Sequence, residues 1–330
     1  MKRLICALLA AALLCGLLPA FAEEPEGGWT FEYSARGKNL YRLGNTGYLV
    51  EGWREFLIPE YLDTVRKNAA QLNEYVPLGG GVKKYVYFIE SPRSVNLDSD
   101  LSGENEVFTL IKEQYEADGI GTLALDKGED FLNWFYKTDQ HWNYKGSYQG
   151  YCDIVRMIFG EDEPLMVPAE TVVFEEAPFN GAFNAKLGYS QSDELFTVYR
   201  FDGMRDYTVF INGGPEKSYG KAEKYFKGKY PRITVYNHYG AFYGGDAGEL
   251  IIDTDQPEKS NLLLISNSYS NAVTLLLAQH FNRIYSVDPR YYKLRMNSDF
   301  HIQKYLKKNQ IDTVLCMGDF RYFMQPFSIK

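Results

Sequence analysis

The stretch that decides the fold runs from Asn261 to Tyr292 and reads NLLLISNSYSNAVTLLLAQHFNRIYSVDPRYY. Leu262 to Ile265 form a short apolar run, which predicts a strand buried on both faces. Polar hydroxyl and amide side chains follow, and Ala272 to Ala278 is so apolar that it predicts a largely buried helix. Arg283 to Val287 predicts the next strand. Together these elements form a βαβ unit, and ligands of such units lie beyond the carboxyl ends of the strands.

The polar turn places serines at the predicted N-terminus of a helix. Unpaired backbone N–H groups and the helix dipole favour negative charge there, which suits a nucleophile whose reaction develops an oxyanion. The alternative interpretation is that Ser268 or Ser270 only caps the helix, because serine is a preferred capping residue. The sequence has no G-x-S-x-G elbow, so an α/β-hydrolase is not indicated, and the base has to come from another part of the chain.

A second polar group, Asp139 and His141, lies just before a predicted amphipathic helix. In an extended segment residues i and i+2 point to the same side, so we expect the carboxylate beside the imidazole. Such a pair fixes the imidazole tautomer and stabilises the imidazolium, as a general base for serine requires. Alternatively, Asp139 caps the helix and His141 is packed by Trp142. No His or Cys spacing typical of zinc occurs, so we expect neither a metal nor an organic cofactor.

Two blocks of the chain resemble a known family. Lys137 to Gly146, KTDQHWNYKG, resembles the signature of bacterial DHHW-family proteins, relatives of the SGNH-hydrolase-like domains of the alginate O-acetylation proteins. Leu262 to Ser270, LLLISNSYS, resembles the serine block of that family, and the resemblance covers most of the chain from about Tyr48 onward. Further similar segments are Tyr87–Asn96, Phe179–Gly188, His238–Asp246 and Tyr285–Tyr292.

The resemblance implies a Ser–His–Asp site, with Ser268 as the nucleophile, His141 as the base and Asp139 as its orienting partner. Two positions depart from the family pattern. Gln140 stands where the motif has its first histidine, and Asn267 precedes the serine where many relatives have Asp or Thr. Neither departure removes a group of the implied site.

Other residues are candidates for the oxyanion hole and the substrate cleft. The backbone N–H groups of the turn around Tyr269, and of Gly244 and Gly245, are candidate oxyanion donors. The aromatic residues before the two glycines are candidates to stack on a sugar, and the alternative is a tight glycine turn with packed aromatic side chains. These residues are Tyr239, Phe242 and Tyr243, and Arg290 is a further candidate for substrate binding.

The chain begins with the features of a secretory signal peptide. A basic start is followed by an apolar stretch from Leu4 to Leu18, and Ala20-Phe21-Ala22 matches an A-x-A cleavage site. We therefore expect residues 1–22 to be removed and the protein to be secreted or extracytoplasmic. No later apolar stretch reaches membrane-spanning length. After the signal only Cys152 and Cys316 remain, and the sequence leaves open whether they pair.

Behind the signal we expect a polar lead-in over residues 23–47 and one SGNH-like domain over residues 48–330. The alternation of strands and helices indicates the α/β class, a parallel sheet flanked by helices. A β-rich insertion is expected at about residues 163–255, where Asn-Gly and Asp-Gly turns separate short β-prone runs. The other predicted helices are Trp53–Tyr75, broken early by Pro59, Glu106–Ala117 and Phe300–Lys308, and the other predicted strands are Tyr85–Ile89, Thr122–Leu125, Thr171–Phe174, Leu195–Arg200, Tyr207–Ile211, Ile233–Tyr236 and Ile311–Met317.

The net charge of the chain indicates which partners are unsuited to it. Its formal net charge is −8 and it has no basic cluster, which argues against binding nucleic acid and docking on anionic lipid. Combined with the resemblance, this describes an exported acyl-transfer protein that passes an acetyl or similar group to a cell-envelope or extracellular glycan, or to water as an acetylesterase. A membrane partner that delivers the acyl donor is compatible with this interpretation. The alternative is a non-catalytic glycan-binding or envelope-assembly protein that keeps the fold.

Overall fold

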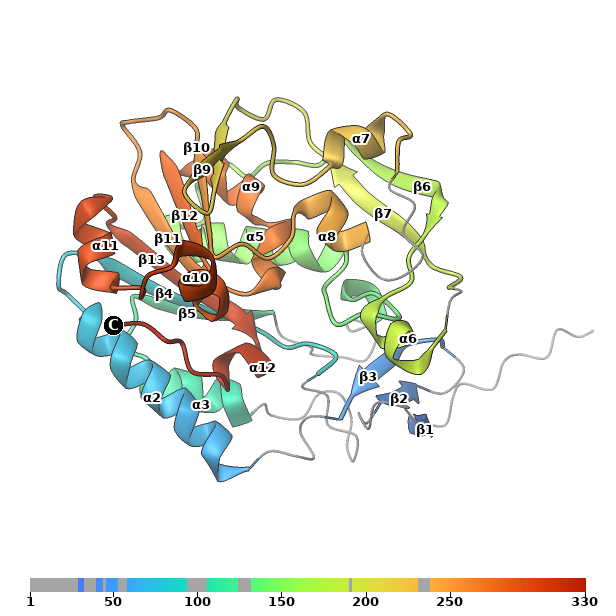
Figure 1. Cartoon of the computed structure of the whole chain (residues 1–330), viewed down its shortest axis with the longest axis horizontal. Coiled ribbons are helices and arrows are strands. Elements are labelled where there is room, and N and C mark those ends of the chain that lie inside the picture. Colours follow the sequence, from blue (N-terminus) through green and yellow to red (C-terminus); the bar gives the residue numbers. More distant parts are fainter. Residues whose placement is uncertain are drawn as a thin grey trace, which may run out of the picture.

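A computed structural model describes residues 29–32, 40–43, 46–52, 58–93, 106–123, 132–189, 192–230 and 238–330. At its centre lies an eight-stranded sheet with the order β5-β4-β13-β11-β12-β10-β8-β9 (Figure 1). The first five strands are parallel, and the last three continue the sheet antiparallel. The strands are β4 Lys83–Ile89, β5 Gly119–Leu123, β8 Thr208–Ile211, β9 Gly214–Glu216, β10 Glu249–Asp253, β11 Asn261–Ser266, β12 Arg283–Val287 and β13 Thr313–Asp319.

The order of the parallel strands marks where a ligand is expected. From β11 the chain passes to its neighbour β12 on one side, then crosses to β13 on the other side. β11 therefore lies at the topological switch point, where open α/β sheets bind ligands in the crevice outside the carboxyl ends of the strands. The residues that follow β11, beginning with Asn267, stand at this crevice.

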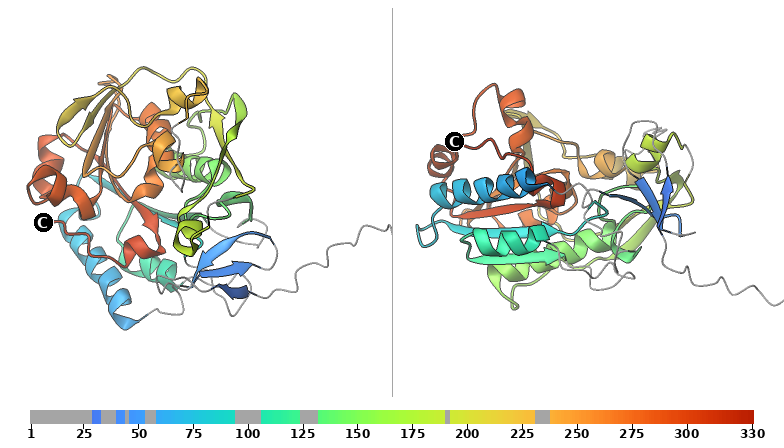
Figure 2. Two further views of the ribbon diagram at one scale, coloured as in Figure 1. Left: turned by 45° about the vertical axis from the view of Figure 1, so that its right-hand side comes forward. Right: turned by 90° about the horizontal axis from the view of Figure 1, so that it is seen from below.

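Helices cover both faces of the sheet, and each face has its own core. Leu262 and Leu264 of β11 belong to the core shared with α5 and α9, whereas Leu263 and Ile265 belong to the core shared with α2, α3 and α11. Figure 2 shows α2 and α5 on opposite sides of the sheet. All four β11 side chains are fully buried, which explains why this run lacks polar alternation. The helices are α2 Pro59–Tyr75, α3 Glu106–Gln114, α5 Tyr144–Phe159, α9 Thr274–Leu277, α10 Pro289–Met296, α11 Ile302–Lys308 and α12 Phe320–Phe323.

Smaller elements gather beyond the carboxyl ends of the parallel strands (Figure 1). A separate hairpin and a three-stranded antiparallel sheet lie there. Phe183 and Leu187 of α6 pack on the three-stranded sheet against Leu40 and Leu49. These elements are β1 Trp29–Glu32, β2 Leu40–Leu43, β3 Leu49–Glu51, β6 Glu170–Pro178, α6 Ala182–Leu187, β7 Leu195–Arg200, α7 Ala222–Phe226 and α8 His238–Tyr243.

The α/β class, with a sheet flanked by helices, is confirmed, but several local predictions need correction. Pro59 begins α2 instead of breaking a longer helix, because proline fits the first helical turn, where N–H groups lack intrahelical partners. Part of the expected polar lead-in forms β1 and β2. β8, β9 and β10 come from the stretch expected to be an insertion, yet they extend the central sheet.

Four other expectations concern the signal segment, one strand, membrane-spanning stretches and the pairing of the two cysteines. The signal segment, residues 1–22, and the strand expected at Ile233–Tyr236 lie outside the described residues. Among the described residues, no helix has the length and apolar character needed to cross a membrane. Cys152 and Cys316 are both free and are buried in the cores on opposite faces of the sheet.

Candidate active site

Ser268 opens the short 3₁₀ turn η3 (Ser268–Ala272) directly after β11. The apolar run after it does not form the single helix that its sequence predicts. It is divided into η3, the four-residue α9 and a second 3₁₀ turn, η4 (Ala278–His280), and most of it is buried as expected. Such short turns sum few peptide dipoles, so the helix dipole contributes little at Ser268.

The three serines of the turn have different surroundings. Ser266 and Ser270 are buried, and the Ser266 hydroxyl donates a hydrogen bond to Ser270 Oγ at 2.6 Å. Ser270 Oγ in turn donates to the carbonyl oxygen of Asn267 at 3.0 Å. Ser268 is only partly buried, and its Oγ faces His141. Ser266 and Ser270 therefore hold the turn, and Ser268 is the serine that a substrate can reach.

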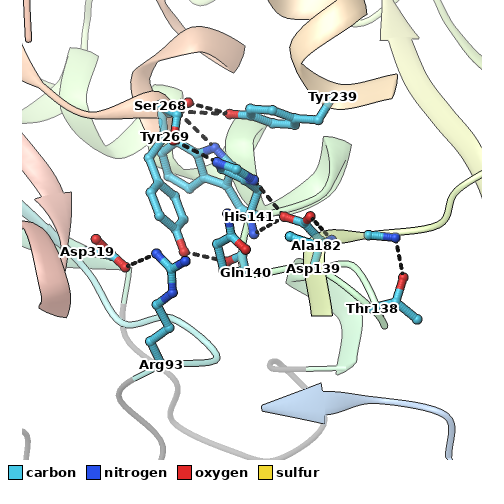
Figure 3. A network of polar contacts seen from close by, with 12 residues as sticks. Arg93, Thr138, Asp139, Gln140, His141, Ala182, Tyr239, Ser268, Tyr269 and Asp319 are labelled. Carbon is cyan, nitrogen blue, oxygen red and sulfur yellow. Dashed lines mark hydrogen bonds and ion pairs between the residues drawn. The ribbon is translucent and has the colours of Figure 1, made fainter. Parts of the chain in front are cut away.

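Asp139, His141 and Ser268 form one hydrogen-bonded line, although 127 residues separate His141 from Ser268 (Figure 3). His141 Nε2 lies 2.8 Å from Ser268 Oγ, and His141 Nδ1 lies 2.6 Å from Asp139 Oδ1. Asp139 Oδ2 accepts the backbone N–H of Ala182, at the start of α6, at 2.8 Å. Burial opposes ionisation of Asp139, but the neighbouring imidazole and these hydrogen bonds outweigh it and lower the pKa of the carboxyl.

The pairing of Asp139 with His141 comes from a turn, not from the extended segment expected. Asp139 Oδ1 also accepts the backbone N–H of His141 at 2.9 Å, which folds the segment back on itself. Asn143, not Asp139, caps α5, because its side chain accepts the N–H groups of Lys145 and Gly146. The alternative in which Asp139 caps this helix is therefore wrong.

Tyr239 supports the imidazole and does not offer its ring to a sugar. It is 3% exposed, and its ring stacks on His141 at a centroid distance of 4.2 Å and an interplanar angle of 13°. Its hydroxyl donates to the carbonyl oxygens of Ser268 at 3.0 Å and Tyr269 at 3.2 Å. Tyr239 thus links His141 to the turn that begins with Ser268 (Figure 3).

The expected oxyanion donors are only partly available. The N–H of Tyr269 donates to Asn267 Oδ1 at 3.3 Å, a long hydrogen bond. The N–H of Gly244 donates to Gly240 O at 3.0 Å, so it is already used within α8. A Cβ at Gly244 would lie 2.3 Å from the Tyr219 ring, so this glycine serves close packing. Gly245 is exposed, and the φ of 104° at Gly244 lies in the left-handed region that favours glycine.

The remaining predicted substrate residues have partners of their own. Arg290, in the first turn of α10, is held by the carboxylate of Asp288 through Nε and Nη2. Phe242 is buried among other aromatic rings. Tyr243 borders a largely apolar cavity of about 130 Å³. That cavity lies between α5, α7, α8, η3 and the end of β7, and its wall includes Tyr144, Tyr148, Tyr199, Phe201, Asn271 and Leu275.

Sequence reasoning assigned no role to three charged residues beside the turn, Glu51, Arg93 and Asp319. Arg93 Nε lies 2.8 Å from Glu51 Oε2, and Arg93 Nη1 lies 3.4 Å from Asp319 Oδ2. Arg93 follows β4 and Asp319 ends β13, so both stand at the carboxyl ends of strands close to β11. Charged residues at the ends of two neighbouring apolar strands were the signal that could have identified them.

The fold is shared with solved structures of low sequence identity. A DHHW family protein from Eubacterium siraeum is 18% identical, with a TM-score of 0.67 over 90% of this chain and 95% of that chain. Bacillus cereus PatB1 is 17% identical, with a TM-score of 0.67 over 89% of this chain and 100% of that chain. A second PatB1 structure, with a sulfonyl adduct, is 15% identical, with a TM-score of 0.65 over 88% and 97% of the two chains.

These likenesses confirm the resemblance in fold to a DHHW family protein that the sequence blocks indicated. No protein-family model matches the sequence, and no curated protein shows significant similarity to it.

Proposed function

We propose that the protein is an exported acyltransferase or acyl esterase in which Ser268 is the nucleophile, His141 the general base and Asp139 its orienting partner. The observation that carries the proposal is the hydrogen-bonded line from Asp139 through His141 to Ser268. A buried carboxylate, an imidazole and a partly exposed hydroxyl in this order meet the needs of general-base catalysis by serine.

In the first half-reaction, Ser268 Oγ attacks the acyl carbonyl carbon of the donor while His141 Nε2 accepts its proton. The C–O bond to the leaving group then breaks, the imidazolium returns the proton to the leaving oxygen, and Ser268 is left acylated. In the second half-reaction, an acceptor hydroxyl gives its proton to His141 and attacks the acyl carbon. Ser268 Oγ leaves and recovers the proton, so the site returns to its starting state.

The oxyanion of each tetrahedral intermediate is proposed to bind the backbone N–H of Tyr269. This N–H is next to the nucleophile along the chain, and its hydrogen bond to Asn267 Oδ1 is long at 3.3 Å. A donor held weakly in the resting site can turn to an oxygen that carries more negative charge. Gly244 takes no part in this step, because its N–H is bound to Gly240 O.

The acceptor is proposed to be a hydroxyl of a cell-envelope or extracellular glycan, with water as the acceptor in an esterase. The A-x-A leader supports export, and the aromatic wall near Tyr243 suits the apolar faces of sugar rings. Delivery of the acyl donor by a membrane partner is part of the same proposal. PatB1, which shares the fold, has a structure with a sulfonyl adduct, and this makes a sulfonyl fluoride a reasonable probe for this chain.

A chromogenic acetyl ester tests the proposal. Wild type should release the chromophore, Ser268→Ala should not, and Ser218→Ala, which changes an exposed serine, should behave as wild type. An added oligosaccharide that becomes acetylated, detected by mass spectrometry, would identify a transferase, and release without acetylated sugar would identify an esterase. Glycan binding without any ester turnover would contradict the proposal and favour a non-catalytic binding protein.

A further inference from the structure

A chain of buried polar groups leads from the serine turn to the three-stranded sheet. We call Asn267, Asp319, Arg93, Glu51 and Lys186 the polar chain. Asn267 Nδ2 donates to Asp319 Oδ1 at 3.0 Å, and Asp319 Oδ2 pairs with Arg93. Arg93 pairs with Glu51 of β3, and Glu51 pairs with Lys186 of α6. Two cations and two carboxylates balance one another along this line.

The burial of these groups makes the pairings obligatory. Asp319 is 0% exposed and Glu51 is 1% exposed, so either carboxylate without its cation would be a strongly unfavourable buried charge. Burial raises the pKa of Glu51, but the charges of Arg93 and Lys186 outweigh it and hold the pKa at about 2. Asp319 is also fixed by the N–H of Tyr322, which it accepts as the cap of α12.

Asp319 determines which way the amide of Asn267 faces. A carboxylate can only accept hydrogen bonds, so the Asn267 Nδ2 group must point to it. This leaves Asn267 Oδ1 facing the opposite way, where it accepts the N–H of Tyr269 and caps the turn that begins with Ser268. An amide turned by half a rotation would place a donor against the Tyr269 N–H and an acceptor against Asp319.

Lys186, at the far end of the polar chain, connects through α6 to Asp139 and His141. Lys186 lies on α6, and the first turn of α6 supplies the Ala182 N–H that binds Asp139 Oδ2. Gly181 permits this close approach, because a Cβ there would lie 2.1 Å from Thr138 O. The contacts thus run from Ser268 through the polar chain to α6, Asp139 and His141, and back to Ser268. Figure 3 shows the pairing of Arg93 with Asp319 and the return from Ala182 through Asp139 and His141 to Ser268.

We propose that Asp319, neutralised by Arg93, is a positioning residue that fixes the amide of Asn267 and so holds Ser268 in line with His141. This inference rests on the proposed function, because it assumes that Ser268 is the nucleophile. Asn267 of the polar chain bonds the Tyr269 N–H, the proposed oxyanion donor, but the chain touches none of the atoms whose bonds form or break. Its loss should therefore lower kcat and the rate of covalent labelling more than it changes KM.

An exchange of the two side chains tests the proposal. Asn267→Asp sets two carboxylates against each other and should lower kcat for an acetyl ester by about 100-fold, as a displacement near 1 Å can do. Asp319→Asn keeps the shape but removes the charge that orders the amide, and should cost about tenfold. In the double variant, position 319 donates and position 267 accepts. It should therefore regain at least tenfold over Asn267→Asp.

Asp253→Asn is the matched control, because Asp253 pairs with Arg283 at the opposite end of β12 and should leave kcat unchanged. Thermal unfolding of every variant checks the fold. Two results overturn the inference while Ser268 still reacts: single variants as active as wild type, or a folded double variant no faster than Asn267→Asp. A wild type that neither turns over ester nor reacts with a sulfonyl fluoride is a different result, because it removes the proposed function and this inference with it.

Discussion

At the residue scale, both oxygens of Asp139 have a partner. Oδ1 accepts from His141 and Oδ2 accepts the N–H of Ala182, so the carboxylate holds the imidazole and is itself held. The sequence could predict this pair and its serine, because both blocks retain the family pattern. It could not predict Tyr239 as the support of His141, since a ring stacked across two distant segments leaves no pattern in either.

Replacing the charge on Asp139 tests this arrangement. Asp139→Asn should lower kcat for an acetyl ester by about 10⁴-fold with KM little changed, because the amide no longer imposes the tautomer that accepts the Ser268 proton. Steady-state kinetics gives both constants. Asp193→Asn is the control. Asp193 forms an exposed ion pair with Lys137, two residues before Asp139, and its replacement should change neither kcat nor KM. Equal activity of Asp139→Asn and wild type would remove Asp139 from the proposed site.

Tyr239→Phe separates the ring from the hydroxyl. The ring keeps its stacking on His141, but the carbonyl oxygens of Ser268 and Tyr269 lose a donor. We expect a loss of stability of about 1–3 kcal/mol in urea unfolding and a lower rate of labelling by a sulfonyl fluoride. Tyr225→Phe is the control, because it removes a buried tyrosine hydroxyl that bonds His238. It should lower stability without changing the labelling rate. A slower labelling rate in both variants would argue against a role for Tyr239 at the nucleophile.

At the element scale, β11 was predictable because its apolar residues are buried on both faces. The sequence could not predict that β8 and β10 join the same sheet. β10 pairs with β12 and β8 pairs with β10, and these pairings depend on how the whole chain folds, not on the residues of the strands alone. The apolar run after Ser268 predicted one buried helix, whereas the structure has two 3₁₀ turns and a four-residue helix. Burial alone does not determine the length of a helix. The Thr274 hydroxyl donates a hydrogen bond to the carbonyl oxygen of Ser270 at 2.7 Å, and this bond competes with backbone hydrogen bonding at that position.

α5 begins three residues after His141, and Asn143 is its N-cap. Asn143→Ala should destabilise the protein by about 0.5–2 kcal/mol, because the N–H groups of Lys145 and Gly146 lose their acceptor. Asn143→Asp keeps an acceptor for these N–H groups but loses the donor to Asn133 O. Its stability should therefore lie between those of wild type and Asn143→Ala. Urea unfolding measures the difference. An alanine variant as stable as wild type would show that the cap contributes nothing.

At the scale of the whole molecule, the polar chain should make stability depend on acid. The pKa of Glu51 is about 2 in the folded protein, against an ordinary value of 4.5. Its contribution is therefore complete above about pH 4.5 and is lost as the pH falls toward 2, since the unfolded chain binds the proton first. The shift corresponds to a contribution on the order of 3 kcal/mol.

Glu51→Gln should remove this acid dependence. The difference in unfolding free energy between wild type and Glu51→Gln should be largest above about pH 5 and should shrink steadily below it. Urea unfolding at several pH values measures that difference. A difference that stays constant with pH would mean that Glu51 is not held ionised by Arg93 and Lys186.

The central claim is that His141 and Asp139 make Ser268 a nucleophile, and covalent labelling tests it most directly. Wild type treated with a sulfonyl fluoride should gain the mass of one adduct, and peptide mapping should place it on Ser268. Ser268→Ala should gain none, and Asp139→Asn should label far more slowly than wild type. No adduct on the folded wild-type protein, or an adduct on Ser268 formed at the same rate without Asp139, would contradict the account.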